Sequence, residues 1–540
     1  MSEGLNTTFR VLCDTENEAA TRVLIPALDC RFPAIRDRAL EALLRRRSPA
    51  GHREIVSRLH TFDDPWRERV AENRERMVPA LREAVISADR QTCINGCRAA
   101  VWLRQYDLIP ALLTGLEDPS NPNATDLSEA LLDLAGLLCD ELSSAADRGQ
   151  RRDAHLVRRR MVGALEMSVG RFAKHRRREI IEAFLLLTYR DDAVLRQVLQ
   201  DPYHPAFVVL VEMLSKIPHD SVMRLLLSFL DDPRAPSAAI SIVSKRSDAT
   251  FVRYFLHKIG REATPAVMHN LKRIEAVAWI RDAATLDLCD DAEQCAATRL
   301  AMVSAIPRAH AFSLVEHLLL HGKPGGRRAA AEALDRFRGS DANLLALQAL
   351  DDHDPEVQAK ILVQLRNRGI PGALARLVEM VDSPHEIVRT AARKSLAEFT
   401  FSRYVASFDL LDEEVRISTG ELVKKVDPQT PALLRAELAS LVRSRRLRGL
   451  AVVQALDLAG DMEDAVVPLL SDEDHLVRAQ AATALGRCLS ETAREALTEA
   501  VSDRSPAVRE AARASLRLHE PPTVAAASPE SPEDDRRDAP

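Results

Sequence analysis

Apolar side chains recur along most of this chain at the three- and four-residue spacing of an amphipathic helix. The pattern is clearest near the end, where residues 474–485 and 505–516 follow one template. Each segment reads Val-Arg, then alanine three residues after the arginine, then a small residue and leucine at six and seven. The two arginines, Arg478 and Arg509, are 31 residues apart. This spacing predicts a repeat that is built from a pair of helices.

The same register continues toward the N-terminus at intervals of 27 to 32 residues. The positions that continue it are Arg448, Arg416, Arg389, Gln358, Arg327, Arg299, Met268, Ala239, Val208 and Arg177, with Arg36 and Arg67 at the same interval. Turns rich in Asp and Pro precede several of them, and these residues favour the first turn of a helix. A fixed period over nearly the whole chain predicts an all-α fold, a right-handed α-solenoid (α-α superhelix) of about sixteen helical hairpins.

The first helix of several repeats carries Ile/Val-Pro followed by Ala/Leu-Leu, as at Pro26, Pro79, Pro110 and Pro468. A proline inside a helix is expected to kink it. Together with the Asp-containing turn and Val-Arg, this pattern resembles the HEAT-repeat family, especially its short bacterial form, the phycobilin-lyase-type repeat. The resemblance covers about residues 20–520. It implies that the recurrent Asp and Arg residues form a ladder between neighbouring repeats.

The period also predicts how the chain is divided. We expect an N-terminal capping helix at residues 1–20, because end repeats need one polar face, and HEAT-like repeats at 21–138. Residues 139–160 break the period and are interpreted as an irregular insertion. The main repeat array is expected at 161–519. Residues 520–540 are rich in Pro, Ser, Asp and Glu and are predicted to be a disordered tail.

Composition narrows the class of protein. Hydrophobic residues make up 46% of the chain and aromatic residues only 4%, which suits helices rich in Ala and Leu. The net charge of -6 argues against attraction of nucleic acid to the whole surface. No apolar run approaches the roughly 18 residues that span a bilayer, and no secretory signal is visible, so a cytoplasmic protein is expected.

Candidate chemistry is sparse. Eight scattered cysteines form no CxxC pair or Cys/His quartet, so we expect free thiols, no metal and no cofactor. The turn aspartates recur with the repeat, and a catalytic carboxylate would not be copied into every hairpin. Trp66 and Trp102 are predicted to pack in the core. These patterns predict a protein that is not an enzyme.

The strongest signal outside the repeat is basic. Between Asp147 and Glu179, eleven Lys and Arg residues are opposed by only four acidic ones. A second basic cluster precedes Arg448, and exposed cations are expected on the second helix of a repeat. The candidate binding residues are Arg158, Arg159, Arg160, Lys174, Arg176, Arg178, Arg393, Lys394, Arg445 and Arg446.

Two functions follow from these patterns. The first is a protein-protein interaction scaffold or adaptor that binds a partner along the concave surface, which stacked hairpins line with their second helices. The alternative is nucleic-acid or anion binding through the basic region 148–178. The two differ in salt dependence, and charge reversal at Arg158–Arg160 should abolish only the second.

Overall fold

The computed structural model describes residues 3–143, 148–261 and 264–519, with residues 148–153 and 261 described by their backbone only. Over these residues the regular structure consists of 34 α-helices and seven short 3-10 helices, and no strand occurs among them. The predicted all-α class is confirmed. The chain divides into two compact units, Met1–Ala330 and Ala331–Pro540, and helix α22 (Pro324–Ala333) contains the boundary.

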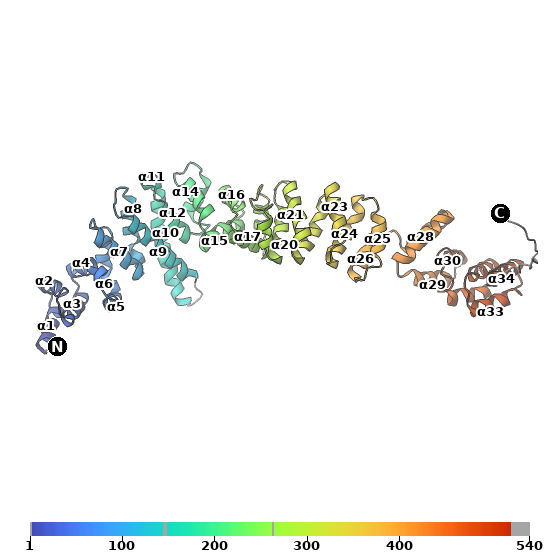
Figure 1. Ribbon diagram of the computed structural model, residues 1–540, viewed down its shortest axis with the longest axis horizontal. Coiled ribbons are helices and arrows are strands. Elements are labelled where there is room, and N and C mark those ends of the chain that lie inside the picture. The colour runs from blue at the N-terminus through green and yellow to red at the C-terminus, as the bar shows by residue number, and fades with distance from the viewer. Residues whose placement is uncertain (1–2, 144–147, 262–263, 520–540) are drawn as a thin grey trace, which may run out of the picture. The chain divides into compact units, whose positions relative to one another are not determined.

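The helices of the first unit follow one another side by side in chain order (Figure 1). Those before the boundary helix are α1 (Glu3–Asp14), α2 (Ala19–Ala27), α3 (Pro33–Arg45), α4 (Pro49–Arg58), α5 (Asp64–Glu72), α6 (Arg74–Val85), α7 (Arg90–Trp102), α8 (Ile109–Glu117), α9 (Ala124–Ser143), α10 (Arg148–Gly170), α11 (Phe172–His175), α12 (Arg178–Leu187), α13 (Ala193–Gln200), α14 (Phe207–Lys216), α15 (Asp220–Ser228), α16 (Ser237–Lys245), α17 (Ala249–Arg261), α18 (Pro265–Leu271), α19 (Ala283–Leu288), α20 (Asp291–Val303) and α21 (Arg308–His321). A 3-10 turn, η1 (Leu59–Thr61), joins α4 to α5.

The second unit is built in the same way. Its helices are α23 (Ser340–Ala349), α24 (Pro355–Leu365), α25 (Ala373–Met380), α26 (Glu386–Ser395), α27 (Phe401–Ser407), α28 (Glu413–Val426), α29 (Thr430–Leu438), α30 (Arg443–Ala455), α31 (Glu463–Val466), α32 (His475–Leu485), α33 (Glu491–Ala500) and α34 (Pro506–His519), with η7 (Val467–Ser471) before α32. The second helices of successive hairpins pack on each other, as α24 on α26 and α32 on α34.

The core lies between these packed helices. The alanines that the template places three residues after Arg478 and Arg509, Ala481 and Ala512, are fully buried, and so is Ile361 of α24. In the second unit one apolar cluster runs from Phe401 to Ala512 through successive hairpins. Each hairpin therefore buries apolar surface against its neighbours as well as between its own two helices.

Aspartates begin several helices, as predicted. The Asp474 carboxylate accepts hydrogen bonds from the backbone N–H groups of Leu476 and Val477 at the start of α32. The Asp354 carboxylate accepts from the N–H of Glu356 at the start of α24. Each carboxylate satisfies an N–H group that the helix itself leaves without a partner.

The recurrent proline does not have one structural position. Pro26 and Pro79 lie inside α2 and α6, whereas Pro110 lies in the first turn of α8 and Pro468 lies in η7. In the first turn the missing N–H removes no helical hydrogen bond. The sequence motif is thus shared by repeats that use the proline differently.

Buried arginines join some hairpins to the one before. Arg46 donates to the carbonyls of Leu12 and Asn17, which precede it by 34 and 29 residues. Arg246 donates to Leu214 and Ile217 in the same manner. The carbonyls of Leu12, Leu214 and Ile217 lie at helix C-terminal ends, where the helix offers them no partner, and Asn17 lies in the turn before α2. The guanidinium has five N–H donors and can satisfy several of them at once.

Two arginines of the C-terminal repeats form rungs of the expected ladder. Arg478 donates to the carbonyl of Asp472 in its own turn at 2.8 Å and pairs with Asp503 of the next repeat at 2.9 Å. Arg446 does the same, with Ser440 at 2.9 Å and Asp472 at 2.8 Å. The ladder position in this repeat is therefore Arg446. The assignment of Arg448 to it was wrong by two residues, because Arg448 instead pairs with Asp409.

The segments set apart by the sequence have these structures. Helix α1 lies within residues 1–20. Residues 139–160 comprise the end of α9 and the beginning of α10, which have 20 and 23 residues. The predicted tail, residues 520–540, lies outside the described residues.

Candidate binding surfaces

The basic region does not form one continuous patch. Three of its arginines pair with acidic residues that are remote in sequence: Arg160 with Asp107 at 3.5 Å, Arg171 with Glu117 at 2.5 Å, and Arg178 with Glu212 at 2.9 Å. A fourth, Arg177, donates to the carbonyl of Leu116 at 3.1 Å. These contacts connect α10, α11 and α12 to helices on either side of them. Much of the charge is therefore engaged within the fold.

Three other candidates are exposed. Arg159, Lys174 and Arg176 have no ion pair within the described part of the chain. Arg176 has a left-handed backbone with φ 53° and ends α11. The side chains of residues 148–153 are outside the description. Three dispersed cations are fewer than the sequence count suggests for this region.

Arg158 lines a cavity away from the other basic side chains described in region 148–178. Its Nε donates to the carbonyl of Leu187 at 2.6 Å, and its guanidinium lies 3.2 Å from the ring centre of Tyr189. Arg190 and Arg224 line the same cavity, which has a volume of about 490 Å³. Burial lowers the pKa of Arg158. Of the predicted basic residues, this one has the most clearly structural contacts.

Glu166, on the same helix as Arg158, lies beside the carboxylate of Asp192. Burial, with a hydrogen bond to Asp192 second in importance, raises the pKa of Glu166 to about 7. Asp192 caps α13, which packs against α10. The Glu166 carboxyl therefore keeps its proton up to about neutral pH, because its ionisation beside another carboxylate in a partly buried place is costly.

Replacing Glu166 with glutamine is expected to change how stability depends on pH. An unfolded glutamate titrates near about 4.3, so between that pH and about 7 the folded state binds more protons than the unfolded state. Wild-type stability should fall as the pH rises through this window, and E166Q should lose that slope. Urea unfolding across the window measures it, with the exposed Glu129→Gln as control. An unchanged slope in E166Q would contradict the assignment.

The remaining candidates lie in the second unit. Arg445 forms a bidentate ion pair with Glu437, in which one N–O distance is 3.0 Å. Arg446 belongs to the ladder. Arg393 is half-buried on α26. Lys394, its neighbour, is exposed and lines a surface groove. Lys394 is thus placed beside the groove described next.

That groove lies between α24 and α26 and has a volume of about 820 Å³. Val363 and Ile387, which are 49% and 48% exposed, give it apolar surface toward its two ends, and two alanines lie between them. The hydroxyl of Ser395 donates to the carbonyl of Leu362 at 3.0 Å, which places the C-terminal ends of the two helices together. The groove therefore runs along two second helices of adjacent repeats.

Charge is distributed unevenly along the groove. Glu356 and Glu386 lie in the first turns of the two helices, and Lys360 and Lys394 lie further along. Lys360 pairs with Glu332 at 2.6 Å. The groove thus has glutamates at the end where both helices begin and Lys394 at the end where α26 finishes, and an exposed apolar side chain lies beside the charges at each end.

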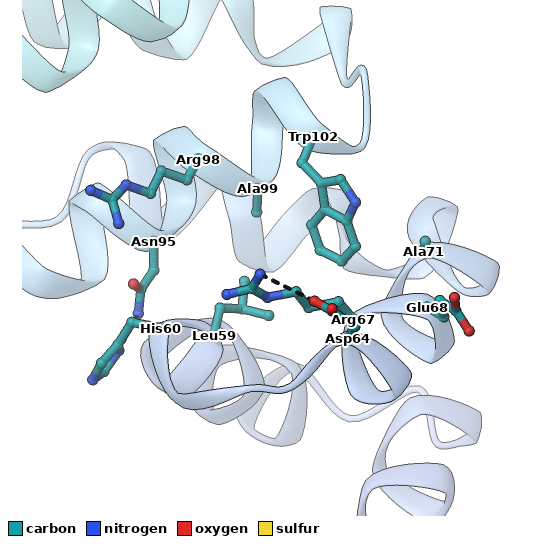
Figure 2. A pocket seen from close by; sticks show the side chains of 10 residues that line it. All are labelled: Leu59, His60, Asp64, Arg67, Glu68, Ala71, Asn95, Arg98, Ala99 and Trp102. Atoms are coloured by element: carbon teal, nitrogen blue, oxygen red, sulfur yellow. Dashed lines mark hydrogen bonds and ion pairs between the residues drawn. The ribbon is translucent and has the colours of Figure 1, made fainter.

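A second cavity, of about 680 Å³, separates α5 from α7 (Figure 2). Each helix contributes four residues at the i, i+3, i+4, i+7 spacing of one helical face. These are Asp64, Arg67, Glu68 and Ala71 of α5, and Asn95, Arg98, Ala99 and Trp102 of α7, with Leu59 and His60 of η1 beside them. The sequence interpretation missed this site, although its spacing was visible.

The two tryptophans considered above differ. Trp66 is half-buried, its Nε1 donates to Asp37 at 2.8 Å, and its ring meets the edge of Phe62, so it packs as predicted. Trp102 is 42% exposed and points into the cavity (Figure 2). The prediction of core packing was wrong for Trp102, because α5 and α7 leave a gap where neighbouring helices would cover the indole.

Other chemistry was also expected from the sequence. All eight cysteines are free thiols, five of them buried. Within the described residues, no group of three or more His, Cys, Asp or Glu side chains is placed to hold a metal ion. None of the helices described is both long enough and apolar enough to cross a bilayer.

The stacked helical hairpins and their inter-repeat ladder define an all-α helical-repeat protein. Residues 313–397 and 432–517 match the model of the HEAT-repeat family, so these segments are HEAT repeats and the family resemblance is confirmed. The narrower resemblance to phycobilin-lyase-type repeats stays a prediction. No curated protein matches the sequence.

Several solved structures are similar to this chain at low identity. One is from a study of the interaction between cadherin and beta-catenin, with 14% identity, 92% of this chain and 98% of that chain covered, and a TM-score of 0.36. Another is Kap121p, with 12% identity, 96% and 70% covered, and a TM-score of 0.26. Human deoxyhypusine hydroxylase is a third, with 16% identity, 58% and 99% covered, and a TM-score of 0.17. None of these similarities assigns a function to the chain.

Proposed function

We propose that this chain is a non-enzymatic scaffold that binds a partner protein along the exposed second helices of its repeats. The observation that supports this most is the groove between α24 and α26, which lies within a matched HEAT segment. Repeat stacks offer extended surfaces on which many modest contacts add up. We place the partner on the concave side, as the sequence pattern led us to expect.

The occupant that suits this groove is an amphipathic helix of the partner. A third helix fits the depression between two packed helices, with its apolar side chains on Val363 and Ile387. Its basic residues would then lie near Glu356 and Glu386, and its acidic residues near Lys394. The glutamate-to-lysine polarity of the groove thus also gives the bound helix a preferred direction.

The double variant Val363→Asp, Ile387→Asp is expected to lose the partner. Each new carboxylate must lose its water when the partner binds, and each position also loses an exposed apolar side chain that would contact the partner. Affinity capture with quantitative mass spectrometry, followed by titration of the captured protein, should show at least about a tenfold loss of affinity. Nuclease treatment should leave capture by the wild type unchanged.

Leu344→Asp is the matched control. Leu344 is 61% exposed on α23, outside the groove, and it receives the same change of side chain. Thermal unfolding should show that both variants remain folded. If the control loses the same proteins as the groove variant, or if neither loses any, the groove is not the binding surface.

The alternative function, nucleic-acid or anion binding through residues 148–178, has weaker structural support. Arg158, Arg160 and Arg178 are engaged with other groups of the fold. Among the described side chains of this region, three exposed cations still support the alternative function: Arg159, Lys174 and Arg176. If it were correct, affinity for duplex DNA would fall steeply as salt is raised.

A further inference from the structure

The cavity between α5 and α7 contains three groups whose interactions are incomplete. The indole of Trp102 has no cation over its face and no hydrogen bond from its Nε1 within the described residues. Glu68 is exposed and has no ion pair there. The carboxylate of Asp64 is 91% exposed and lies 3.6 Å from Arg67, which is a weak, solvated contact.

These groups lie toward one end of the cavity. In Figure 2 the indole points from α7 toward α5, and Asp64 and Glu68 lie on α5 one helical turn apart. A cation beside an aromatic face and carboxylates is stabilised by two interactions, with the ring quadrupole and with the negative charges. Trp66 already has such a cation within the chain, because the Arg36 guanidinium lies over its ring at 6.0 Å.

The opposite end of the cavity has a different character. The guanidinium of Arg98 points away from Trp102 toward the side where Asn95 and His60 lie (Figure 2). Asn95 is fixed there, since its amide donates to the carbonyl of Ser57 at 2.8 Å and contacts His60 Nδ1 at 3.0 Å. Arg98 is exposed and has no ion pair in the described part of the chain, so it can donate to backbone carbonyls of a bound peptide.

We infer that this cavity binds a basic side chain of a partner protein, with the cation on Trp102 beside Glu68 and the partner backbone at Arg98. The inference rests on the proposed function, because the occupant is a partner polypeptide. The volume of about 680 Å³ lies within the range of about 300–1,000 Å³ that accommodates a side chain with its flanking backbone. Tryptophan and arginine are also the residues most often found at the energetic centres of interfaces.

The experiment uses the full chain labelled with 5-fluorotryptophan. The chain has three tryptophans, so its fluorine spectrum has three signals, which Trp→Phe variants assign. N-acetylarginine methylamide is expected to shift the Trp102 signal saturably. N-acetylcitrulline methylamide, which has nearly the same shape but no charge, is expected to leave it unchanged. Glu68→Gln should weaken the arginine probe by about threefold.

Glu72→Gln is the matched control, because Glu72 is exposed on the same helix but does not line the cavity. It should leave the affinity unchanged. The inference is overturned if the two probes shift Trp102 equally, if neither does, if N-acetylglutamate methylamide replaces arginine as the better ligand, or if E68Q binds like the wild type. Since the free probe reports on the first unit alone, a failure here leaves the groove test in the second unit unaffected.

Discussion

Replacing Arg478 with methionine is expected to lower the free energy of unfolding of the C-terminal repeats by about 3–5 kcal/mol. The side chains of Arg478 and Asp503 are only 4% and 14% exposed, and they are joined by bonds of 2.9 and 3.0 Å. Methionine keeps most of the volume but leaves the Asp503 carboxylate and the Asp472 carbonyl without this donor. Urea unfolding, with hydrogen exchange in α32 and α34, measures the loss.

The same pair makes a pH-dependent contribution. The hydrogen bond from Arg478 is the main cause that lowers the pKa of Asp503 in the folded state. The stabilisation is therefore complete above the unfolded value of about 3.9 and is lost as the pH falls through the folded value. The control is Arg494→Met, an exposed arginine whose i,i+3 pair with Glu491 is solvated, and it should have little effect. Equal losses in the two variants would show that the ladder does not stabilise the repeats.

Trp279→Ala is expected to destabilise the first unit by about 3–5 kcal/mol, since it empties the site of the largest fully buried side chain described. The indole is 1% exposed, and its Nε1 has no hydrogen-bond partner among the described residues. Trp279→Phe should therefore be much milder, because it keeps an aromatic ring and removes an unsatisfied N–H group. Urea unfolding followed by circular dichroism compares the variants.

Trp102→Ala is the control for Trp279→Ala, because it makes the same substitution at an exposed tryptophan. Its side chain is 42% exposed and borders a cavity, so its loss should leave the stability of the first unit almost unchanged. A loss comparable to that of Trp279→Ala would mean that Trp102 packs in the core after all. That result would also remove the basis for a binding role of the cavity.

The repeat architecture was predictable because its causes are local. Helical spacing, capping aspartates and a recurring Val-Arg all lie within a dozen residues of one another, and each recurs with the period. The ladder register was less certain in one repeat. Arg443, Arg445, Arg446 and Arg448 all lie within one turn and a half of α30, and the contacts with the Ser440 carbonyl and with Asp472 distinguish Arg446 from the others.

The binding surfaces were harder to predict because their determinants are remote. The acidic partners of Arg160, Arg171 and Arg178 lie 53, 54 and 34 residues away, so a local charge count could not show that these cations are engaged. Similarly, whether Trp102 is covered depends on how far α5 lies from α7. The apolar groove was partly anticipated, since Lys394 was named, but Val363 and Ile387 resemble ordinary helix residues in the sequence.

The arginine-to-carbonyl links described above have a consequence for synthesis of the chain. Arg46 reaches back 34 residues to Leu12, and Arg368 reaches back 34 residues to Leu334. A hairpin can therefore complete its docking as soon as the following thirty or so residues have left the ribosome. Because such short-range contacts require little loop closure, we expect the protein to assemble stepwise from its N-terminus while translation is still in progress.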